Sequence, residues 1–482
     1  MSPLAILLSL ALYGLLLLVV GRLAARRGGN AAFFTAERRT AWYVVWPAMI
    51  SAAMSGITFV SVPGSVAADG VTYMQMVAGF TIGQLLLAFW LTPLFYRLRL
   101  TSIYEYFSHR FGATAHRTSA WFFLLSKLAA AALKLSIVCV VMQQLLFGRL
   151  GVPLWANVLL TMAVVWGYTR RGGVRAVIHT DLIKTALMLA AVVVSIGAVA
   201  HALGWSVGEL WQEVAAQPRS MWICTDPTSD RYLWKMVVAG VVLLLAMTGL
   251  DQDLMQRNLA CRSLGDAQKN IVLTAVSQIV VILLFLVLGY FLYRYAELKE
   301  LPIPAKGDEL FALVAVEGGL PMAVGVLFIL GFASGSFSAG GSALTALTTS
   351  VVFDLMNGSQ CDENQLKKLR LRVHALLAVI LTVVVVGFGY WASDSVINLI
   401  YRVAGYTYGP LLGLFLFGSL TRYRVRDRWV WVVALFSPLV SAAVQWGASA
   451  WFGYQIGFEL LVLNALLTMG GLWLLRCGKT TA

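Results

Sequence analysis

Residues 51–64 read Ser51-Ala-Ala-Met-Ser-Gly-Ile-Thr58-Phe-Val-Ser-Val-Pro63-Gly64, within an otherwise apolar stretch that begins near residue 41. Gly56, Pro63 and the small hydroxyl residues weaken a helix here. Irregular backbone persists at membrane depth only where protein or a wet cavity satisfies its polar groups. We therefore expect an unwound turn whose carbonyls face a cation and whose hydroxyls face a solute. Close helix packing through small residues accounts for the same composition, and the residues alone leave this alternative open.

The rest of the chain has the composition of a membrane protein. Of its 482 residues, 60% are hydrophobic and only 12% are charged, which is about half the charged share of a soluble domain. This excludes a soluble enzyme, a disordered protein and a nucleic-acid-binding module. The formal net charge of +14 comes from short Lys and Arg clusters between apolar runs, which is a topology signal. We expect an all-α integral membrane protein in the lipid bilayer, with no nucleic-acid partner and no required oligomer.

Windows of about 20 apolar residues predict about 13 transmembrane helices. The expected spans are 3–22, 41–64, 72–96, 115–147, 153–169, 176–202, 232–255, 269–294, 319–353, 367–390, 394–418, 428–447 and 455–476. Basic residues gather in alternate loops, for example around Arg97, Arg170 and Arg257. Because basic loops stay in the cytoplasm, the N-terminus is expected outside and the C-terminus in the cytoplasm of a multi-pass protein of the inner (plasma) membrane. Residues 1–482 are expected to form a single transmembrane domain.

The expected span at 319–353 carries a stripe of hydroxyl groups. Ser338, Ser342, Thr345 and Thr349 are spaced so that they lie on one helix face. Such a stripe holds helices together by hydrogen bonds, or it offers a ladder of oxygens to a hard cation such as Na⁺. Both interpretations remain open at this point.

Charged residues inside apolar spans are expensive, so each marks a candidate site. Asp181 and Lys184 stand three residues apart and are expected to pair, either as part of a cation region or as a structural ion pair. Lys127 and Lys134, seven residues apart, share one helix face. For Lys134, snorkelling to a membrane interface is the alternative.

Five stretches occur in order between about residues 30 and 360. They are Ser55-Gly-Ile-Thr58-Phe-Val-Ser-Val-Pro63-Gly64, Thr101-Ser-Ile-Tyr-Glu105-Tyr-Phe, Gly172-Gly173-Val-Arg-Ala-Val-Ile-His179-Thr180-Asp181, Gly249-Leu-Asp251-Gln252-Asp253-Leu-Met-Gln256-Arg257 and Ser342-Ala-Leu-Thr345. Together they resemble the sodium:solute symporter family of sugar, proline, iodide and sialic acid carriers. Any one of them is a weak signal, whereas the ordered set is specific.

The resemblance implies a LeuT-like fold with two five-helix halves related as an inverted repeat. These halves would be 41–202 and 232–418, with 1–40 and 419–482 as peripheral helices. Solute and ion would bind at mid-membrane beside the broken first helix of each repeat. The implied function is secondary active transport, namely sodium-coupled symport of a small organic solute by alternating access.

The resemblance also implies which residues form the sites. The sodium ligands would be the carbonyls of Ser51, Met54 and Gly335 and the hydroxyl of Ser338, with Asp181 supporting the cation region. The solute would contact Ser55, Thr58, Gln75, Lys127 and Thr248. Lys127 favours an anionic solute. Na⁺ is the expected coupling ion, and no cofactor is expected.

Three positions depart from the family pattern. Ala339 stands where the second of two consecutive hydroxyl residues is usual, Gly341 where close relatives often carry an acid, and Lys184 where Gln is common. Loss of an oxygen ligand weakens a sodium site, and a fixed ammonium repels a mobile cation or replaces it. Lys184 and Ser342 are therefore expected to modify coupling, and a sodium-independent or proton-coupled carrier of the same fold is the alternative.

A membrane-embedded enzyme is the more distant alternative. The sequence contains no HExxH or GxSxG motif, and its histidines stand mostly at the expected ends of helices. We therefore expect a transporter rather than an enzyme, although the residues do not identify the solute.

Overall fold

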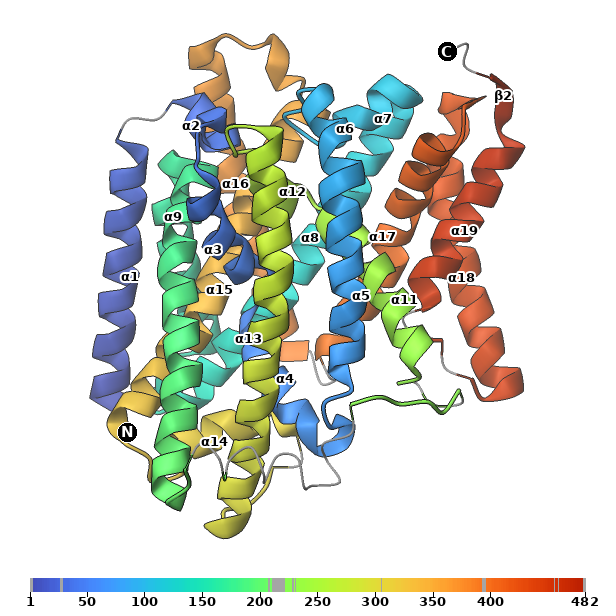
Figure 1. The fold of residues 1–482 in the computed structure, drawn as a ribbon. Helices are drawn as coiled ribbons and strands as arrows, with labels where there is room; N and C mark the ends of the chain where they lie inside the picture. The colour runs from blue at the N-terminus through green and yellow to red at the C-terminus, as the bar shows by residue number, and fades with distance from the viewer. Residues whose placement is uncertain are drawn as a thin grey trace.

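The computed structural model is a bundle of long helices that run roughly side by side (Figure 1). It describes residues 3–26, 29–206, 209, 222–227, 229, 231–304, 306–391, 396–454, 456–457 and 459–479. The bundle is flanked by α1 (Pro3–Ala25) at one edge and by α18 (Val430–Phe452) and α19 (Glu459–Leu474) at the other. The start of α1 and the end of α19 lie at opposite ends of the bundle (Figure 1).

Over the described residues, nine helices are long and apolar enough to cross a membrane, or up to eleven if each of two bent pairs is one span. Besides α1 and α18, the long helices are α5 (Tyr73–Leu86), which continues through η2 (Leu87–Leu91) into α6 (Thr92–Arg97), α8 (Ala113–Met142), α9 (Leu154–Leu203), α13 (Leu264–Leu298), α15 (Met322–Ser350), α16 (Glu363–Trp391) and α17 (Val396–Leu420). The protein is therefore an all-α, multi-pass membrane protein, as predicted.

The helix α9 joins two of the expected spans. Its 50 residues correspond to about 75 Å, more than twice the hydrocarbon thickness of a bilayer. Gly173 interrupts it with a φ of +49°, a conformation that favours glycine. The expected spans 153–169 and 176–202 therefore lie on either side of this break. The total of about 13 membrane helices stays a prediction.

The first broken helix is the one predicted from residues 51–64. It consists of α3 (Trp42–Ala53) and α4 (Gly56–Asp69), which are bent by 58°. Met54 and Ser55 between them are extended, and Ser55 caps α4 in a reciprocal capping box with Thr58. The break leaves the last carbonyls of α3 without intrahelical partners. The predicted interruption is confirmed.

A second broken helix crosses the bundle. It runs through α11 (Leu233–Leu244) and the π-helical turn η5 (Leu245–Gly249), then bends by 76° into α12 (Gln252–Asn258). Asp251 caps α12 by accepting a hydrogen bond from the Asp253 amide at 2.8 Å. Two carboxylates thus lie at the break itself.

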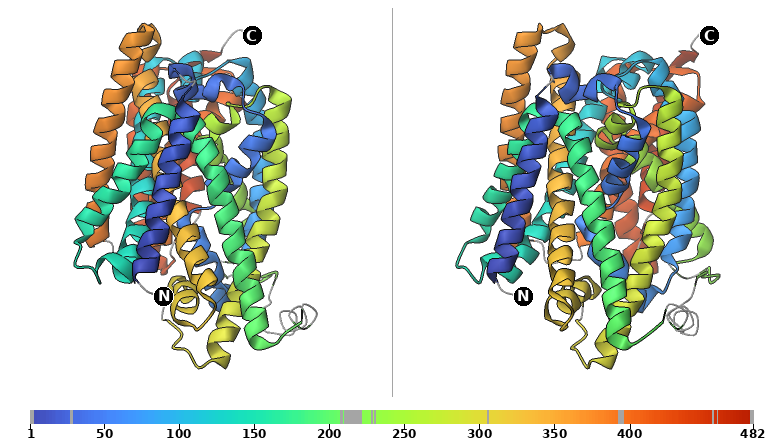
Figure 2. Two further views of the ribbon diagram at one scale, coloured as in Figure 1. Left: turned by 90° about the vertical axis from the view of Figure 1, so that its left-hand side faces the viewer. Right: turned by 60° about the vertical axis from the view of Figure 1, so that its left-hand side comes forward.

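Glycine contacts bring the helices around the breaks close together. A Cβ at Gly335 of α15 would lie 2.4 Å from the Gly56 amide nitrogen of α4. A Cβ at Gly79 of α5 would lie 2.2 Å from the Val237 carbonyl oxygen of α11. Such approaches are possible only without a side chain. In the turned views, α1 lies along α9 at the surface of the bundle (Figure 2).

The remaining elements lie mostly at the ends of the long helices. They are α2 (Asn30–Thr35), η1 (Ala36–Arg38), α7 (Glu105–Arg110), η3 (Gln143–Phe147), η6 (Gly307–Glu309), α14 (Leu310–Glu317), η7 (Val351–Leu355), η8 (Gly358–Gln360) and η9 (Asp427–Trp429). Two short strands, β1 (Tyr423–Val425) and β2 (Arg476–Lys479), pair antiparallel. They join the loop after α17 to the end of α19.

Candidate functional site

A cavity of about 60 Å³ lies where the two broken helices meet α8, α9, α15 and α17. It is lined by Ala52, Ser55, Lys127, Ala130, Ala131, Lys134, Lys184, Met247, Asp251, Asp253, Leu254, Ser338, Ala339, Ser342 and Tyr408. Six of these were named from the sequence as site residues or as departures from the family pattern: Ser55, Lys127, Lys184, Ser338, Ala339 and Ser342. The long-range folding of the chain therefore brings a part of the predicted site to one cavity.

Lys127 binds both carboxylates of the second break. Its ammonium nitrogen lies 3.0 Å from Asp251 Oδ2 and 2.7 Å from Asp253 Oδ2. The Tyr408 hydroxyl also donates to Asp251 Oδ2, at 2.7 Å. Lys127 was predicted to attract an anionic solute. In the structure, Asp251 and Asp253 neutralise its charge, and these ion pairs join α8 to the second broken helix.

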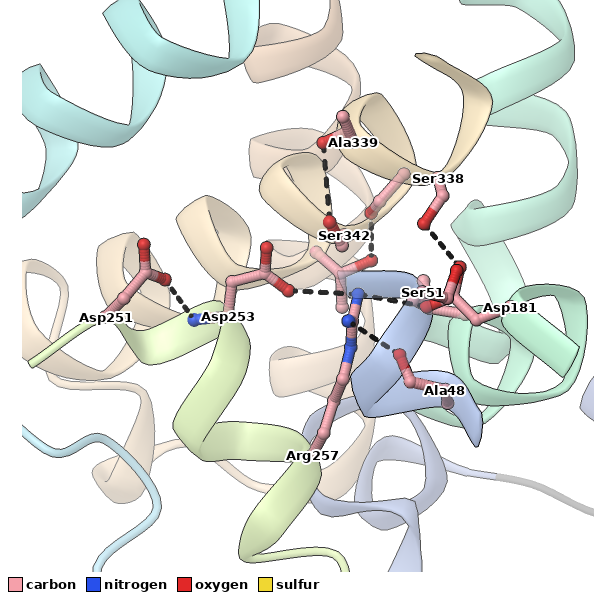
Figure 3. A network of polar contacts seen from close by, with 12 residues as sticks. Ala48, Ser51, Asp181, Asp251, Asp253, Arg257, Ser338, Ala339 and Ser342 are labelled. Carbon is pink, nitrogen blue, oxygen red and sulfur yellow. Dashed lines mark hydrogen bonds and ion pairs between the residues drawn. The ribbon is translucent and has the colours of Figure 1, made fainter. Parts of the chain in front are cut away.

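Arg257 continues the ion-pair network across the bundle. Its guanidinium nitrogen NH2 lies 3.1 Å from Asp181 Oδ2 and 3.3 Å from Asp253 Oδ1 (Figure 3). The Arg257 side chain is 2% exposed, so the sequence-based placement of this residue in a basic loop is wrong. Lys127, Asp253, Arg257 and Asp181 thus form one chain of charges from α8 through α12 to α9.

Asp181 and Lys184 do not form the predicted ion pair. The Asp181 carboxylate pairs with Arg257 and accepts a hydrogen bond from the Ser338 hydroxyl. The Lys184 ammonium donates instead to the Ser51 carbonyl oxygen at 2.5 Å. The prediction failed because a second cation, distant in sequence, lies closer to the carboxylate.

The sodium ligands implied by the resemblance are partly engaged by the protein. The Ser51 carbonyl accepts from Lys184, and the Ser338 hydroxyl donates to Asp181. Met54 is buried at the break, and Gly335 packs against the start of α4. An ammonium therefore stands at the carbonyl end of α3, where the helix dipole attracts a cation.

The other implied solute contacts lie outside the cavity lining. Thr58 is used in the cap of α4. The Gln75 amide nitrogen donates to the Arg231 carbonyl at 3.0 Å, and its oxygen accepts from the Cys224 amide at 3.1 Å. Thr248 is half-buried in the π-helical turn η5. Gln75 thus fastens a connecting segment to α5.

Four polar residues of the cavity were not assigned to the site from the sequence: Lys134, Asp251, Asp253 and Tyr408. Asp251 and Asp253 belong to the stretch Gly249–Arg257, one of the five that resemble the family. Two carboxylates so close to Gly249 in an apolar span could have indicated a site. Lys134 stands two helical turns beyond Lys127 on the same face. For Tyr408, no comparable signal exists in the local sequence.

Two broken helices that meet at a polar cavity inside a membrane-spanning bundle define the LeuT-like class of carrier folds. The family model described as "Sodium:solute symporter family" matches residues 33–426. The chain belongs to this family of symporters.

The relatives are cotransporters of several solutes. The human sodium/iodide cotransporter is 26% identical over 412 residues, with 81% of this chain and 62% of that protein covered. The sodium-dependent multivitamin transporter of Oryctolagus cuniculus is 27% identical over 401 residues, with 80% and 60% covered. The sodium-coupled monocarboxylate transporter 2 of Danio rerio is 24% identical over 377 residues, with 76% and 59% covered. The chain thus spans about 60% of the length of these relatives.

The fold also matches a solved transporter structure. A Na⁺-coupled sialic acid symporter in a substrate-bound outward-open state superimposes with a TM-score of 0.84 at 18% identity, and 99% of both chains is covered. This match shows that the two proteins share the LeuT-like fold over their whole lengths.

Proposed function

We propose that the protein is a secondary active transporter that carries a small organic solute across the inner (plasma) membrane by alternating access. The observation that carries the proposal is the cavity between the two broken helices, lined by polar and charged groups inside a membrane-spanning bundle. Polar cavities at membrane depth are expensive and mark solute or ion pathways. The family supports the same conclusion.

Two five-helix halves, 41–202 and 232–418, form the moving parts in this proposal, with 1–40 and 419–482 at the periphery. The N-terminus is outside and the C-terminus in the cytoplasm, since the basic loops then face the cytoplasm. The first helix of each half is the broken one, α3–α4 and α11–α12. The ion pairs of Lys127 and Arg257 link α12 to α8 and α9. A displacement of α12 relative to α8 and α9 would have to break these ion pairs or move all three helices together.

We propose Na⁺ as the coupling ion, bound near the carbonyls of α3 and the hydroxyls of α15. The names of the relatives, which include sodium-coupled carriers of iodide and monocarboxylates, support this assignment. The free carbonyl end of α3 and the adjacent Asp181 supply negative potential there. Ser338 retains lone pairs that can coordinate a cation while its hydrogen is donated to Asp181.

One observation favours a second candidate, a carrier that works without sodium. The Lys184 ammonium already lies on the Ser51 carbonyl, one of the expected sodium ligands. In this candidate, Lys184 serves as a tethered cation in place of Na⁺, and coupling is absent or uses protons. Ala339, which offers no hydroxyl where the family has one, favours the same candidate.

Uptake into proteoliposomes distinguishes the two candidates and tests transport itself. Purified protein is reconstituted and uptake of radiolabelled solutes is followed under an inward Na⁺ gradient, an inward proton gradient, or neither. Accumulation only under the Na⁺ gradient supports sodium symport. Equal rates under all three conditions support the sodium-independent candidate. Empty liposomes and liposomes containing Asp181→Ala protein are the controls, and no uptake above both contradicts transport.

A further inference from the structure

The cavity between the broken helices contains one more cation than its carboxylates balance. Three ammonium groups line it against two carboxylates: Lys127, Lys134, Lys184, Asp251 and Asp253. The adjacent pair of Arg257 and Asp181 adds one charge of each sign, so the excess of one positive charge remains.

The excess can be traced to Lys134. Lys127 contacts both carboxylates of the second break, and Lys184 donates to the Ser51 carbonyl. Among the residues that the structure describes, none forms a hydrogen bond or ion pair with the Lys134 ammonium. The side chain is half-buried and lines the cavity. An ammonium at this depth is costly without a partner.

We propose that Lys134 is the anion-binding residue of the cavity and that the solute is a small organic monocarboxylate. This inference rests on the proposed transport function and names its substrate class. One negative charge on the solute neutralises the excess, and a carboxylate accepts charge-assisted hydrogen bonds from an ammonium. Lys127 stands seven residues away, or about 10 Å along α8. Lys127 is already paired with Asp251 and Asp253, so Lys134 is the ammonium left to bind a solute carboxylate.

The other residues that line the cavity match a solute with a short apolar part. Ala52, Ala130, Ala131 and Met247 provide apolar surface, and Ser55 provides a hydroxyl. The volume of about 60 Å³ is several times the 10–15 Å³ that one water molecule needs. It therefore leaves room for a short-chain carboxylate in this conformation. An inorganic anion would gain nothing from the alanine surface.

Binding to purified full-length protein tests this inference separately from transport. Thermal unfolding is followed with acetate, propionate and pyruvate as their sodium salts, with propionamide as the neutral counterpart of propionate, and with sodium iodide, all at constant Na⁺ concentration and ionic strength. A ligand that binds the folded protein raises its unfolding temperature. We expect at least one carboxylate to raise it, propionamide to leave it unchanged, and iodide to have a smaller effect.

Two substitutions at the same position locate the binding group. Lys134→Gln is expected to raise the apparent Kd of the responding carboxylate at least tenfold, whereas Lys134→Arg retains binding because it keeps the charge. Lys269→Gln, at an exposed lysine of α13, is the matched control and leaves the Kd unchanged. Retention by Lys134→Arg also shows that the cavity is still formed.

Each outcome of these measurements decides one point. An unchanged Kd in Lys134→Gln, an equal response to propionate and propionamide, or no response to any carboxylate overturns the inference. If iodide binds more tightly than every carboxylate, the inference that the solute is organic is overturned. Lys134-dependent binding of a carboxylate without uptake in proteoliposomes contradicts the transport function and supports the binding site.

Discussion

The Lys184 ammonium nitrogen lies 2.5 Å from the main-chain carbonyl oxygen of Ser51, across the interface between α9 and α3. Ser51 is in the last turn of α3, where carbonyls lack intrahelical partners and the helix dipole is negative. A lysine from a neighbouring helix thus supplies a cation to the end of the broken helix. This contact bears directly on how the protein binds its coupling ion.

Replacing this lysine together with the missing hydroxyl is expected to increase sodium dependence. In Lys184→Gln with Ala339→Ser, the fixed ammonium is removed and one oxygen ligand is added. A change of about 1.4 kcal/mol in the binding of Na⁺ corresponds to a tenfold lower half-saturating concentration. Uptake into proteoliposomes over a range of Na⁺ concentrations measures this. Each single substitution is the control for the other, and an unaltered Na⁺ dependence in the double variant contradicts the prediction.

Asp181→Ala is expected to abolish concentrative uptake and to destabilise the protein. Removing one partner of a buried ion pair costs about 3–5 kcal/mol, because the other charge is left uncompensated. Here Arg257 retains its ion pair with Asp253, at 3.3 Å, and its hydrogen bond to the Ala48 carbonyl. Adding Arg257→Met to Asp181→Ala is expected to recover part of the lost unfolding temperature, since the orphaned guanidinium is removed.

The Asp181 prediction requires that the variant be folded and inserted, which size-exclusion elution and membrane-fraction yield report. Concentrative uptake equal to that of the native protein would contradict it. Failure of the double variant to recover any stability would show that the contact between Asp181 and Arg257 is not the source of the loss.

Lys127→Met and Lys134→Met form a matched pair with opposite expected effects on stability. Lys127→Met leaves the Asp251 and Asp253 carboxylates without their shared cation and is expected to lower the unfolding temperature markedly. Lys134→Met removes an ammonium that has no partner among the described residues, so the unfolding temperature in the absence of solute is expected to stay equal or rise. Equal destabilisation by the two substitutions would contradict the charge assignment.

The reactivity of a cysteine at position 55 is expected to show that this position faces the cavity. Ser55 lines it, whereas Thr58 does not and Leu125 is 57% exposed on the outer face of α8. In a background without the native Cys361 and Cys477, Ser55→Cys is expected to react with a small aqueous thiol reagent faster than Thr58→Cys or Leu125→Cys. A bound carboxylate is expected to protect it. Labelling at position 55 no faster than at 125 would remove the first break from the solute site.

Gly335→Ala is expected to destabilise the protein by about 1–3 kcal/mol, the typical cost of overpacking. The added Cβ would lie 2.4 Å from the Gly56 amide nitrogen, which is backbone and cannot rotate away. Gly197→Ala in α9 is the matched control, because a Cβ there meets no atom within 4 Å and alanine favours the helix by about 1 kcal/mol. Thermal unfolding of both variants measures the difference, and similar stabilities would contradict the close contact.

The sequence by itself determined the helical membrane architecture and the first break. Hydropathy over about 20 residues decides whether a segment enters the bilayer, and this information is local. The break after Ala53 was also local, because Gly56, Ser55 and Thr58 supply both the weakness of the helix and the cap that restarts it. The second break was implied only through the family resemblance.

Only the tertiary structure decided which charges meet. Spacing along one helix favoured a pair of Asp181 with Lys184, but packing brought Arg257 closer to the carboxylate and Lys184 to a carbonyl of α3. The same packing neutralised Lys127 with Asp251 and Asp253. Buried charges choose partners by distance and desolvation across helix interfaces. Those distances depend on close contacts such as Gly335 on Gly56, which helical periodicity in one segment does not encode.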